Sequence, residues 1–170
     1  MSSSRGAAKR LREQLAGDEI IVAPGCYNAM GARMIERTGF STVYISGYGV
    51  SVNHVGRSDV GLATLSEMTD VASKVASSVK VPVICDADTG YGNALNVQRT
   101  VRLFERCGAN AIQLEDQTNP KRCGHLTGKS LVSTAEFVGK IKAATDARAS
   151  ETTLIMARTD AIAVEGFKPA

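Results

Sequence analysis

Short apolar runs alternate with helical patterns along the whole chain, and this alternation restricts the fold more than any other feature of the sequence. The runs cover residues 19–23, 42–45, 81–85, 111–114 and 154–157. They are apolar throughout rather than at every second residue, which is typical of strands that are buried on both faces. Such strands, separated by helices, predict an α/β fold in which helices cover a parallel sheet.

Helices are expected over residues 8–16, 28–37, 64–79, 94–107 and 133–144, between loops at 46–49 and an irregular stretch at 50–63. Thr64 and Glu67 match a capping box, in which the two side chains satisfy free N–H groups at the start of a helix. Ser133 and Glu136 repeat the pattern. We therefore expect residues 1–17 to form an N-terminal helical segment and residues 18–170 to form one β/α domain.

Composition excludes several classes of function. The net charge is only +3, and no basic cluster is interleaved with aromatic residues, so we expect no binding to nucleic acid. No apolar run approaches the ~20 residues that span a bilayer, so we expect no membrane segment. The four cysteines form no CxxC pair and are expected to be free thiols of a reducing compartment.

The N-terminus lacks the apolar region of a secretory signal. We therefore expect a cytoplasmic protein. Its Ser- and Arg-rich composition leaves the mitochondrial matrix open for a eukaryotic source, whereas Glu13 argues against that address.

Polar residues stand at or just past the ends of four different strands. In a parallel sheet all these ends open on one face, which is where α/β enzymes place their sites. The residues concerned are Ser46, Asp86, Asp88, Glu115 and Arg158. We expect them to converge.

Asp86 and Asp88 suggest a metal site. Residues i and i+2 of a strand point the same way, so both carboxylates are expected to face one cation. Hard oxygen ligands suit Mg²⁺ or Mn²⁺ better than Zn²⁺. For an isolated Asp-x-Asp, a turn cap and a solvated acid are the simpler interpretation, but Glu115 at the end of the next strand favours a shared metal site.

Cys123 lies in a short loop among Lys121, Arg122 and His125. Neighbouring cations favour the thiolate, which fits a cysteine for proton transfer or nucleophilic attack. The alternative is an exposed thiol without a role in a basic loop.

Three motifs together resemble the isocitrate lyase and phosphoenolpyruvate mutase superfamily, most closely its 2-methylisocitrate lyase and 2,3-dimethylmalate lyase branch. They are DADTGYG at 86–92, LEDQ at 114–117 and KRCGH at 121–125. SGYG at 46–49 and ARTDA at 157–161 extend the likeness, which covers the chain from about residue 8 onward.

The resemblance implies a (β/α)₈ TIM barrel, Mg²⁺ (or Mn²⁺), a homotetramer and a small-molecule carboxylate substrate. Asp86 and Asp88 would hold the metal, with Glu115 nearby. Ser46, Gly47, Tyr48 and Asp59 match positions that bind the substrate or shape its loop. Lys121, Gly124, His125 and Arg158 would contact carboxylates, and Cys123 would protonate the departing carbanion.

The implied reaction is cleavage of a carbon–carbon bond in a 2-hydroxy di- or tricarboxylate, which yields an α-keto acid such as pyruvate and a carboxylic acid. Phosphonate chemistry of the phosphoenolpyruvate or carboxyphosphonate mutase type is the alternative within enzymes, although the KRCGH loop favours the lyase branch.

Two features depart from the family pattern. Tyr48 stands where methylisocitrate lyases more often have glycine, which favours a substrate of the dimethylmalate type. The chain contains five of the eight expected β/α units, and the sixth should begin at residues 166–170. A fragment of a longer enzyme and a catalytically inactive truncated subunit are therefore both open hypotheses.

Overall fold

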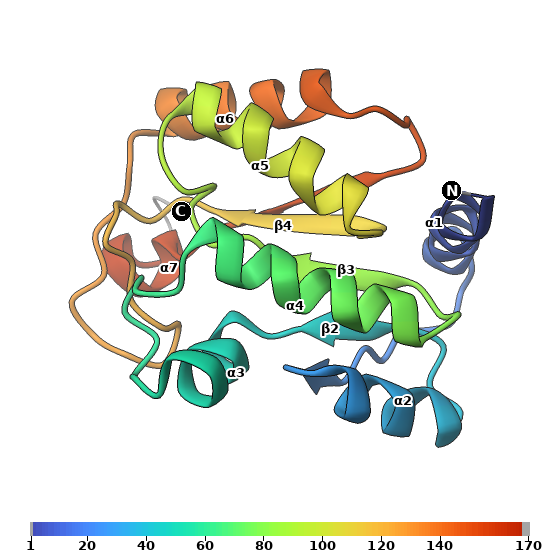
Figure 1. The fold of residues 1–170 in the computed structure, drawn as a ribbon. Helices are drawn as coiled ribbons and strands as arrows, with labels where there is room; N and C mark the ends of the chain where they lie inside the picture. Colours follow the sequence, from blue (N-terminus) through green and yellow to red (C-terminus); the bar gives the residue numbers. More distant parts are fainter. Residues whose placement is uncertain (1, 168–170) are drawn as a thin grey trace.

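The computed structural model describes residues 2–167, and within them five strands form one parallel sheet (Figure 1). The spatial order of the strands follows the sequence, as in successive β/α units of a TIM barrel. The predicted parallel sheet is therefore confirmed. The strands are β1 (Gly25–Cys26), β2 (Val43–Ile45), β3 (Val83–Asp86), β4 (Ala111–Glu115) and β5 (Leu154–Arg158).

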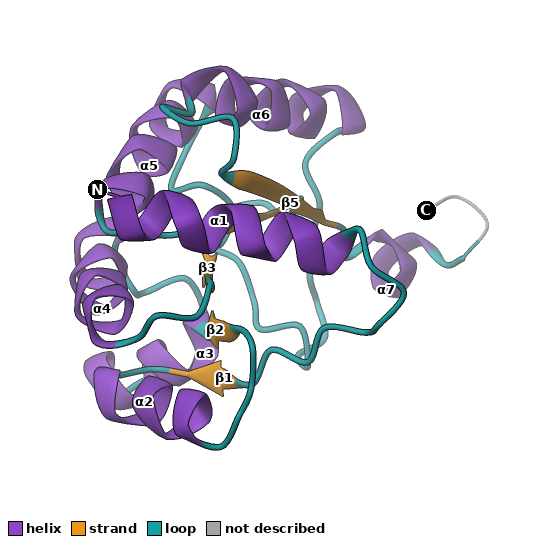
Figure 2. Cartoon of the chain, turned by 90° about the vertical axis from the view of Figure 1, so that its right-hand side faces the viewer, coloured by secondary structure: helices purple, strands orange, loops and turns teal. Residues whose placement is uncertain are grey.

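Helices α2, α4, α5 and α6 form an arc along one side of the sheet (Figure 2). The α-helices are α1 (Ser2–Leu15), α2 (Ala29–Arg37), α3 (Gly47–Val50), α4 (Leu65–Ser78), α5 (Ala94–Arg106), α6 (Thr134–Ala147) and α7 (Ala161–Glu165), and the π-helix η1 covers Ser51–Val55. The sixth unit predicted from residue 166 falls partly on residues 168–170, which lie outside the described residues.

The main core lies between the sheet and this arc. Side chains of β2 and β4, such as Ile45 and Ile112, pack with Met68 of α4 and Phe104 of α5, and all four are fully buried. Burial of one such side chain stabilises a fold by about 1.5–3 kcal/mol. The apolar positions predicted for α4 and α5 therefore hold both helices on the sheet.

Helix α1 crosses the end of the sheet at which the strands begin (Figures 1 and 2). Leu11 is 1% exposed and packs with Ile84 and Ala111 in a second, smaller cluster. The guanidinium groups of Arg10 and Arg12 donate to the carbonyl oxygens of Lys80 and Thr152, which precede β3 and β5. The opposite end of the sheet therefore remains free for the polar side chains.

The strand predicted at residues 19–23 was wrong. Pairing with β2 begins only at Pro24, whose carbonyl oxygen accepts from the N–H of Tyr44, and the strand itself is Gly25–Cys26. The side chain of Ile20 is 90% exposed, whereas Ile21 packs in the smaller cluster beside α1. The apolar run thus crosses the end of the sheet instead of extending it.

Local structure also differs from the sequence-based prediction at other places. The loop predicted at 46–49 is mostly helix α3, and the stretch predicted as irregular begins with η1. The capping box at Thr64 and Glu67 is confirmed in full. At the start of α6 the hydroxyl of Ser133 accepts from the N–H of Glu136, but the Glu136 carboxylate lies 3.7 Å from Lys140.

Within residues 2–167, none of the helices combines the length and the apolar character that crossing a bilayer requires.

Candidate active site

The carboxyl ends of β3, β4 and β5 place polar side chains on the face of the sheet opposite the main core. Asp86 pairs in register with Gln113, and Glu115 pairs with Arg158. Because side chains alternate along a strand, Gln113 and Glu115 point the same way as Asp86 and Arg158. The residues predicted to converge are thereby brought to one edge.

Asp88 reaches this edge by a route that the sequence did not predict. Strand β3 ends at Asp86, and Asp88 lies beyond it with φ 47°, so the alternation rule does not apply to this pair. The Asp86 carboxylate instead accepts from the N–H of Asp88, and also from the N–H of Gly47, at 3.2 Å in each case. A Cβ at position 47 would lie 2.7 Å from Asp86 Oδ2, so this contact requires glycine.

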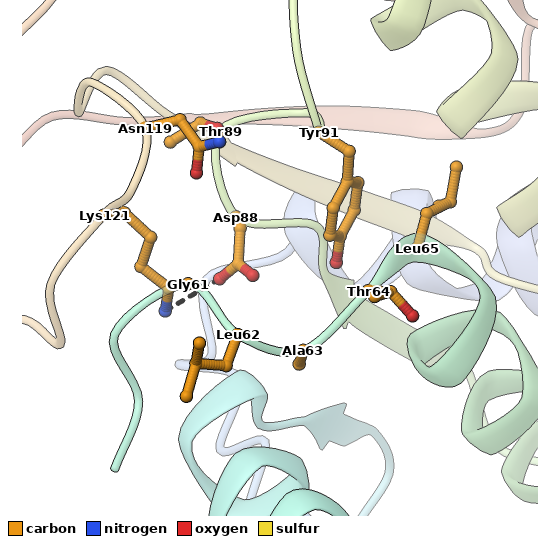
Figure 3. A pocket seen from close by; sticks show the side chains of 10 residues that line it. All are labelled: Gly61, Leu62, Ala63, Thr64, Leu65, Asp88, Thr89, Tyr91, Asn119 and Lys121. Atoms are coloured by element: carbon orange, nitrogen blue, oxygen red, sulfur yellow. Dashed lines mark ion pairs between the residues drawn. The ribbon is translucent and has the colours of Figure 1, made fainter. Parts of the chain in front are cut away.

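Lys121 lies between two buried carboxylates. Its Nζ is 2.5 Å from Asp59 Oδ1, and its side chain is only 3% exposed. The same Nζ is 2.8 Å from Asp88 Oδ1 (Figure 3). Burial alone lowers the pKa of Lys121, but the two carboxylates raise it more, so its pKa lies above the usual value. Lys121 was predicted to contact substrate carboxylates; the structure shows it engaged with carboxylates of the chain itself.

The negative charge at this edge is concentrated and poorly solvated. Burial, and then repulsion from Asp86, raises the pKa of Asp88 to about 6, although Lys121 opposes the shift. Burial raises the pKa of Glu115 to about 8 against the opposing effect of Arg158. Both acids would therefore gain from a further cation nearby.

Arg158 joins the end of β4 to the loop after β5. Its guanidinium lies 3.2 Å from Glu115 Oε2 and 3.0 Å from Asp160 Oδ2, and its side chain is 31% exposed. A Cβ at Gly124 would lie 2.8 Å from Arg158 Nη2, so the KRCGH loop passes directly over this cation. Arg158 is therefore anchored by acids and still accessible to a ligand.

Cys123 is 8% exposed, contrary to the alternative of an exposed thiol. Its backbone N–H donates to the carbonyl oxygen of Asp59, which fixes the loop beside the Lys121 ion pairs. Its Sγ lies 3.5 Å from Nδ1 of the exposed His125. An imidazole at this distance can exchange a proton with the thiol.

Ser46 and Tyr48 are placed differently from one another. The hydroxyl of Ser46 accepts from the N–H of Gly49 and caps α3. The side chain of Tyr48 is 55% exposed. More than half of the surface of Tyr48 is therefore accessible to solvent or to a ligand.

Several polar side chains of the site were not predicted. The Tyr44 hydroxyl accepts from Gln113 Nε2 at 3.0 Å, and burial together with Asp86 raises the pKa of Tyr44. Gln117 is buried and donates to Glu115 Oε1, and Lys129 donates to the carbonyl oxygen of Gly124 at 2.6 Å. Alternation along β2 and β4 could have revealed Tyr44 and Gln113. Gln117 lies in the LEDQ motif but was given no role, and no sequence pattern marks Lys129.

The donor set fits a hard divalent cation. Among the described residues, no group of three or more His, Cys, Asp or Glu side chains is arranged so that it could by itself hold a metal ion. Mg²⁺ needs only one or two carboxylates, because it retains several waters. Asp88 Oδ1 is buried and pairs with Lys121 Nζ at 2.8 Å. Asp86 and Asp88 are therefore suitable direct ligands, with Glu115 farther out beside Arg158.

Comparison with known families gives a match over almost the entire chain. A family model described as phosphoenolpyruvate phosphomutase covers residues 11–169. The chain is 52% identical to 2,3-dimethylmalate lyase of Eubacterium barkeri, over 96% of this chain and 56% of that protein. It is also 52% identical to 2-methylisocitrate lyase of Aeropyrum pernix, over 94% of this chain and 51% of that protein. The chain thus spans about half the length of the curated relatives it matches.

Solved structures agree in fold. Oxaloacetate acetylhydrolase in complex with 3,3-difluorooxalacetate superposes with a TM-score of 0.92 at 39% identity, over 97% of this chain and 57% of that one. Phosphonopyruvate hydrolase in complex with oxalate and Mg²⁺ superposes with a TM-score of 0.87 at 34% identity, over 96% and 56% of the two chains.

Proposed function

The chain belongs to the phosphoenolpyruvate phosphomutase family of the isocitrate lyase superfamily, whose members are enzymes, and from this we propose that it carries the site of a Mg²⁺-dependent carbon–carbon lyase. The substrate class is a small 2-hydroxy di- or tricarboxylate. The observation that carries the proposal is the buried edge at which Asp86, Asp88 and Glu115 face Lys121 and Arg158.

The metal would be held by Asp86 and Asp88. A Mg²⁺ ion bound there would supply Lewis-acid stabilisation to the substrate hydroxyl oxygen, which becomes the keto oxygen of the product. Lys121 keeps Asp88 and Asp59 in fixed positions, because its ammonium is paired with both. Arg158 is accessible enough to pair with a substrate carboxylate, and this would reduce repulsion as negative charge develops.

The reaction breaks the bond between the hydroxyl-bearing carbon and its neighbour. The hydroxyl gives its proton to solvent water and becomes the carbonyl of an α-keto acid, while the electron pair of the broken bond remains on the neighbouring carbon. Cys123 donates its thiol proton to that carbon and forms the second carboxylic acid. His125, 3.5 Å away, then restores the thiol proton from solvent.

The 2,3-dimethylmalate type is our first choice of substrate. It agrees with the relative from Eubacterium barkeri and with Tyr48, which departs from the glycine of methylisocitrate lyases. Phosphonate chemistry is the second candidate, because phosphonopyruvate hydrolase shares the fold. The intact KRCGH loop favours the lyase, since bond cleavage needs a proton donor for the carbanion.

The test is product formation from a panel of four compounds: α-keto acid from 2,3-dimethylmalate and 2-methylisocitrate, oxalate from oxaloacetate, and phosphate or phosphoenolpyruvate from phosphonopyruvate. We expect turnover of a 2-hydroxy acid that requires Mg²⁺ and is lost in Cys123→Ser but kept in Cys107→Ser, a matched change away from the site. Activity that persists with EDTA and in Cys123→Ser would rule out the mechanism. Turnover of phosphonopyruvate alone would favour the second candidate. Tight Mn²⁺ binding without any turnover would favour an inactive binding subunit.

A further inference from the structure

A cavity of about 260 Å³ opens beside the acid cluster, by which we mean Asp59, Asp86, Asp88 and Glu115 (Figure 3). One wall is the segment from Gly61 to Leu65, which leads into α4, and the other contains Asp88, Thr89 and Tyr91 of the turn after β3. Asn119 and Lys121 complete the lining. A water molecule occupies roughly 30 Å³ of liquid volume, so this cavity has room for several.

Two independent irregularities occur beside this cavity. Among the described residues, Asp88 and Tyr91 are the non-glycine residues with positive φ, 47° and 61°. In the same part of the chain the buried Tyr91 hydroxyl lacks a hydrogen-bond partner, whereas the buried Asp88 Oδ1 is held by its 2.8 Å ion pair with Lys121. Both residues line the cavity. Strained backbone and unsatisfied buried polar groups are typical of functional sites.

Packing explains the ring of Tyr91 but not its hydroxyl. The ring packs against the main core, and phenylalanine would pack there equally well. The hydroxyl is buried and has no hydrogen-bond partner among the residues that the structure describes, which disfavours the fold. Burial and the nearby Asp88 carboxylate raise the pKa of Tyr91 well above its usual value, so this hydroxyl remains a donor.

We propose that Tyr91 is a positioning residue for the metal site: its hydroxyl donates to a water molecule in the cavity, and this water holds Asp88 in the orientation that binds the cation. The inference rests on the proposed function, because it concerns the carboxylate that would bind Mg²⁺. It assigns a role to a side chain that touches neither the cation nor the substrate.

The arrangement of charges supports a water rather than a direct bond to a protein group. Lys121 approaches Asp88 Oδ1 and Asp59 from the loop, so it fixes only one side of the Asp88 carboxylate. Tyr91 projects into the cavity from the turn that also carries Asp88 (Figure 3). A water bridging the two would give the Tyr91 hydroxyl the partner that it lacks and would hold the Asp88 carboxylate on the side that Lys121 does not reach. Mg²⁺ retains waters that can join such a network.

The experiment compares Tyr91→Phe with wild type, with Tyr27→Phe as a matched control on a partly exposed ring. Mn²⁺ affinity is measured by isothermal titration, and the urea midpoint of unfolding is measured without metal. We expect Tyr91→Phe to bind Mn²⁺ about tenfold more weakly, as for other residues that orient metal ligands, and to unfold at an equal or higher urea concentration. Tyr27→Phe should change neither quantity.

The two measurements distinguish this role from a structural one, because Mn²⁺ binding is expected to weaken while the urea midpoint does not fall. A lower urea midpoint with unchanged Mn²⁺ affinity would show that the hydroxyl serves the fold and would overturn the inference. Unchanged Mn²⁺ affinity with a raised KM for substrate would place the hydroxyl on the substrate and would equally count against it. If wild type itself binds no Mn²⁺, the proposed function fails, and this role fails with it.

Discussion

Replacement of Lys121 by methionine tests the electrostatics of the acid cluster most directly. The ammonium is 3% exposed and pairs with two buried carboxylates, at 2.5 and 2.8 Å. Methionine has a similar length and fills the space without charge. Removal of one partner from a buried pair typically costs about 3–5 kcal/mol, because the remaining charge is left uncompensated. We expect Lys121→Met to lose about that much stability at pH 7.

The loss should depend on pH in a definite direction. Burial and Asp86 already raise the pKa of Asp88 in the folded protein above its unfolded value. Lys121 opposes this shift, so the pKa rises further when Lys121 is removed. The unfolded chain then binds fewer protons than the folded one between these two values, so stability falls as pH increases through that window. The difference between wild type and variant should therefore be smaller at pH 5 than at pH 7.

The assay is urea unfolding followed by circular dichroism at both pH values. Lys142→Met is the control, because Lys142 pairs with Asp146 on the surface of α6 with its side chain 74% exposed. Such exposed pairs contribute about 0–1 kcal/mol. The double variant Asp59→Asn with Lys121→Met should recover part of the loss. A cost below about 1 kcal/mol at pH 7, or an equal cost at pH 5, would refute the reasoning.

Three further predictions concern the same edge of the sheet. Mn²⁺ affinity should rise between pH 5.5 and 8 with release of protons, because the metal competes with protons on Asp88 and Glu115. Titration calorimetry in two buffers of different ionisation enthalpy would measure the protons released, and an affinity that does not change with pH would contradict the prediction. Gly47→Ala should cost about 1–3 kcal/mol and weaken Mn²⁺ binding, because its Cβ would meet Asp86 Oδ2. The matched Gly139→Ala in α6 has free space around its Cβ and should be about 0.5–1 kcal/mol more stable in urea unfolding. Lys129→Met removes the hydrogen bond to the Gly124 carbonyl and should speed alkylation of the Cys123 thiol by iodoacetamide, with Lys74→Met as the control. An unchanged alkylation rate would show that this hydrogen bond does not hold the 121–125 loop in place.

The five longer helices and four of the five strands were predictable, because their signals are local, whereas the short helices α3, η1 and α7 were not predicted. The capping box before α4 and the apolar positions of α4 and α5 depend on residues three or four apart, and the structure contains them as expected. The first strand was wrong because the apolar run of residues 19–23 crosses the end of the sheet, and ladder pairing with β2 begins only at Pro24. Periodicity indicates which residues are buried, but not which neighbour buries them.

The candidate site was predictable in position but not in its contacts. Parallel strands bring Asp86, Glu115 and Arg158 to one edge whatever the details of packing. Asp88 was expected to follow strand alternation, but the turn after β3 places it in the left-handed region. Lys121 was expected to bind substrate, but its closest partners are acids of the chain itself.

The sequence by itself therefore determined the β/α order, the parallel sheet and the edge at which acids and cations gather, because these follow from periodicity along the chain. Only the tertiary structure decided which groups compensate one another: Lys121 with Asp59 and Asp88, and Arg158 with Glu115, while the Tyr91 hydroxyl has no partner within residues 2–167. Pairing and desolvation depend on distances between segments that are remote in sequence, and no local pattern encodes those distances.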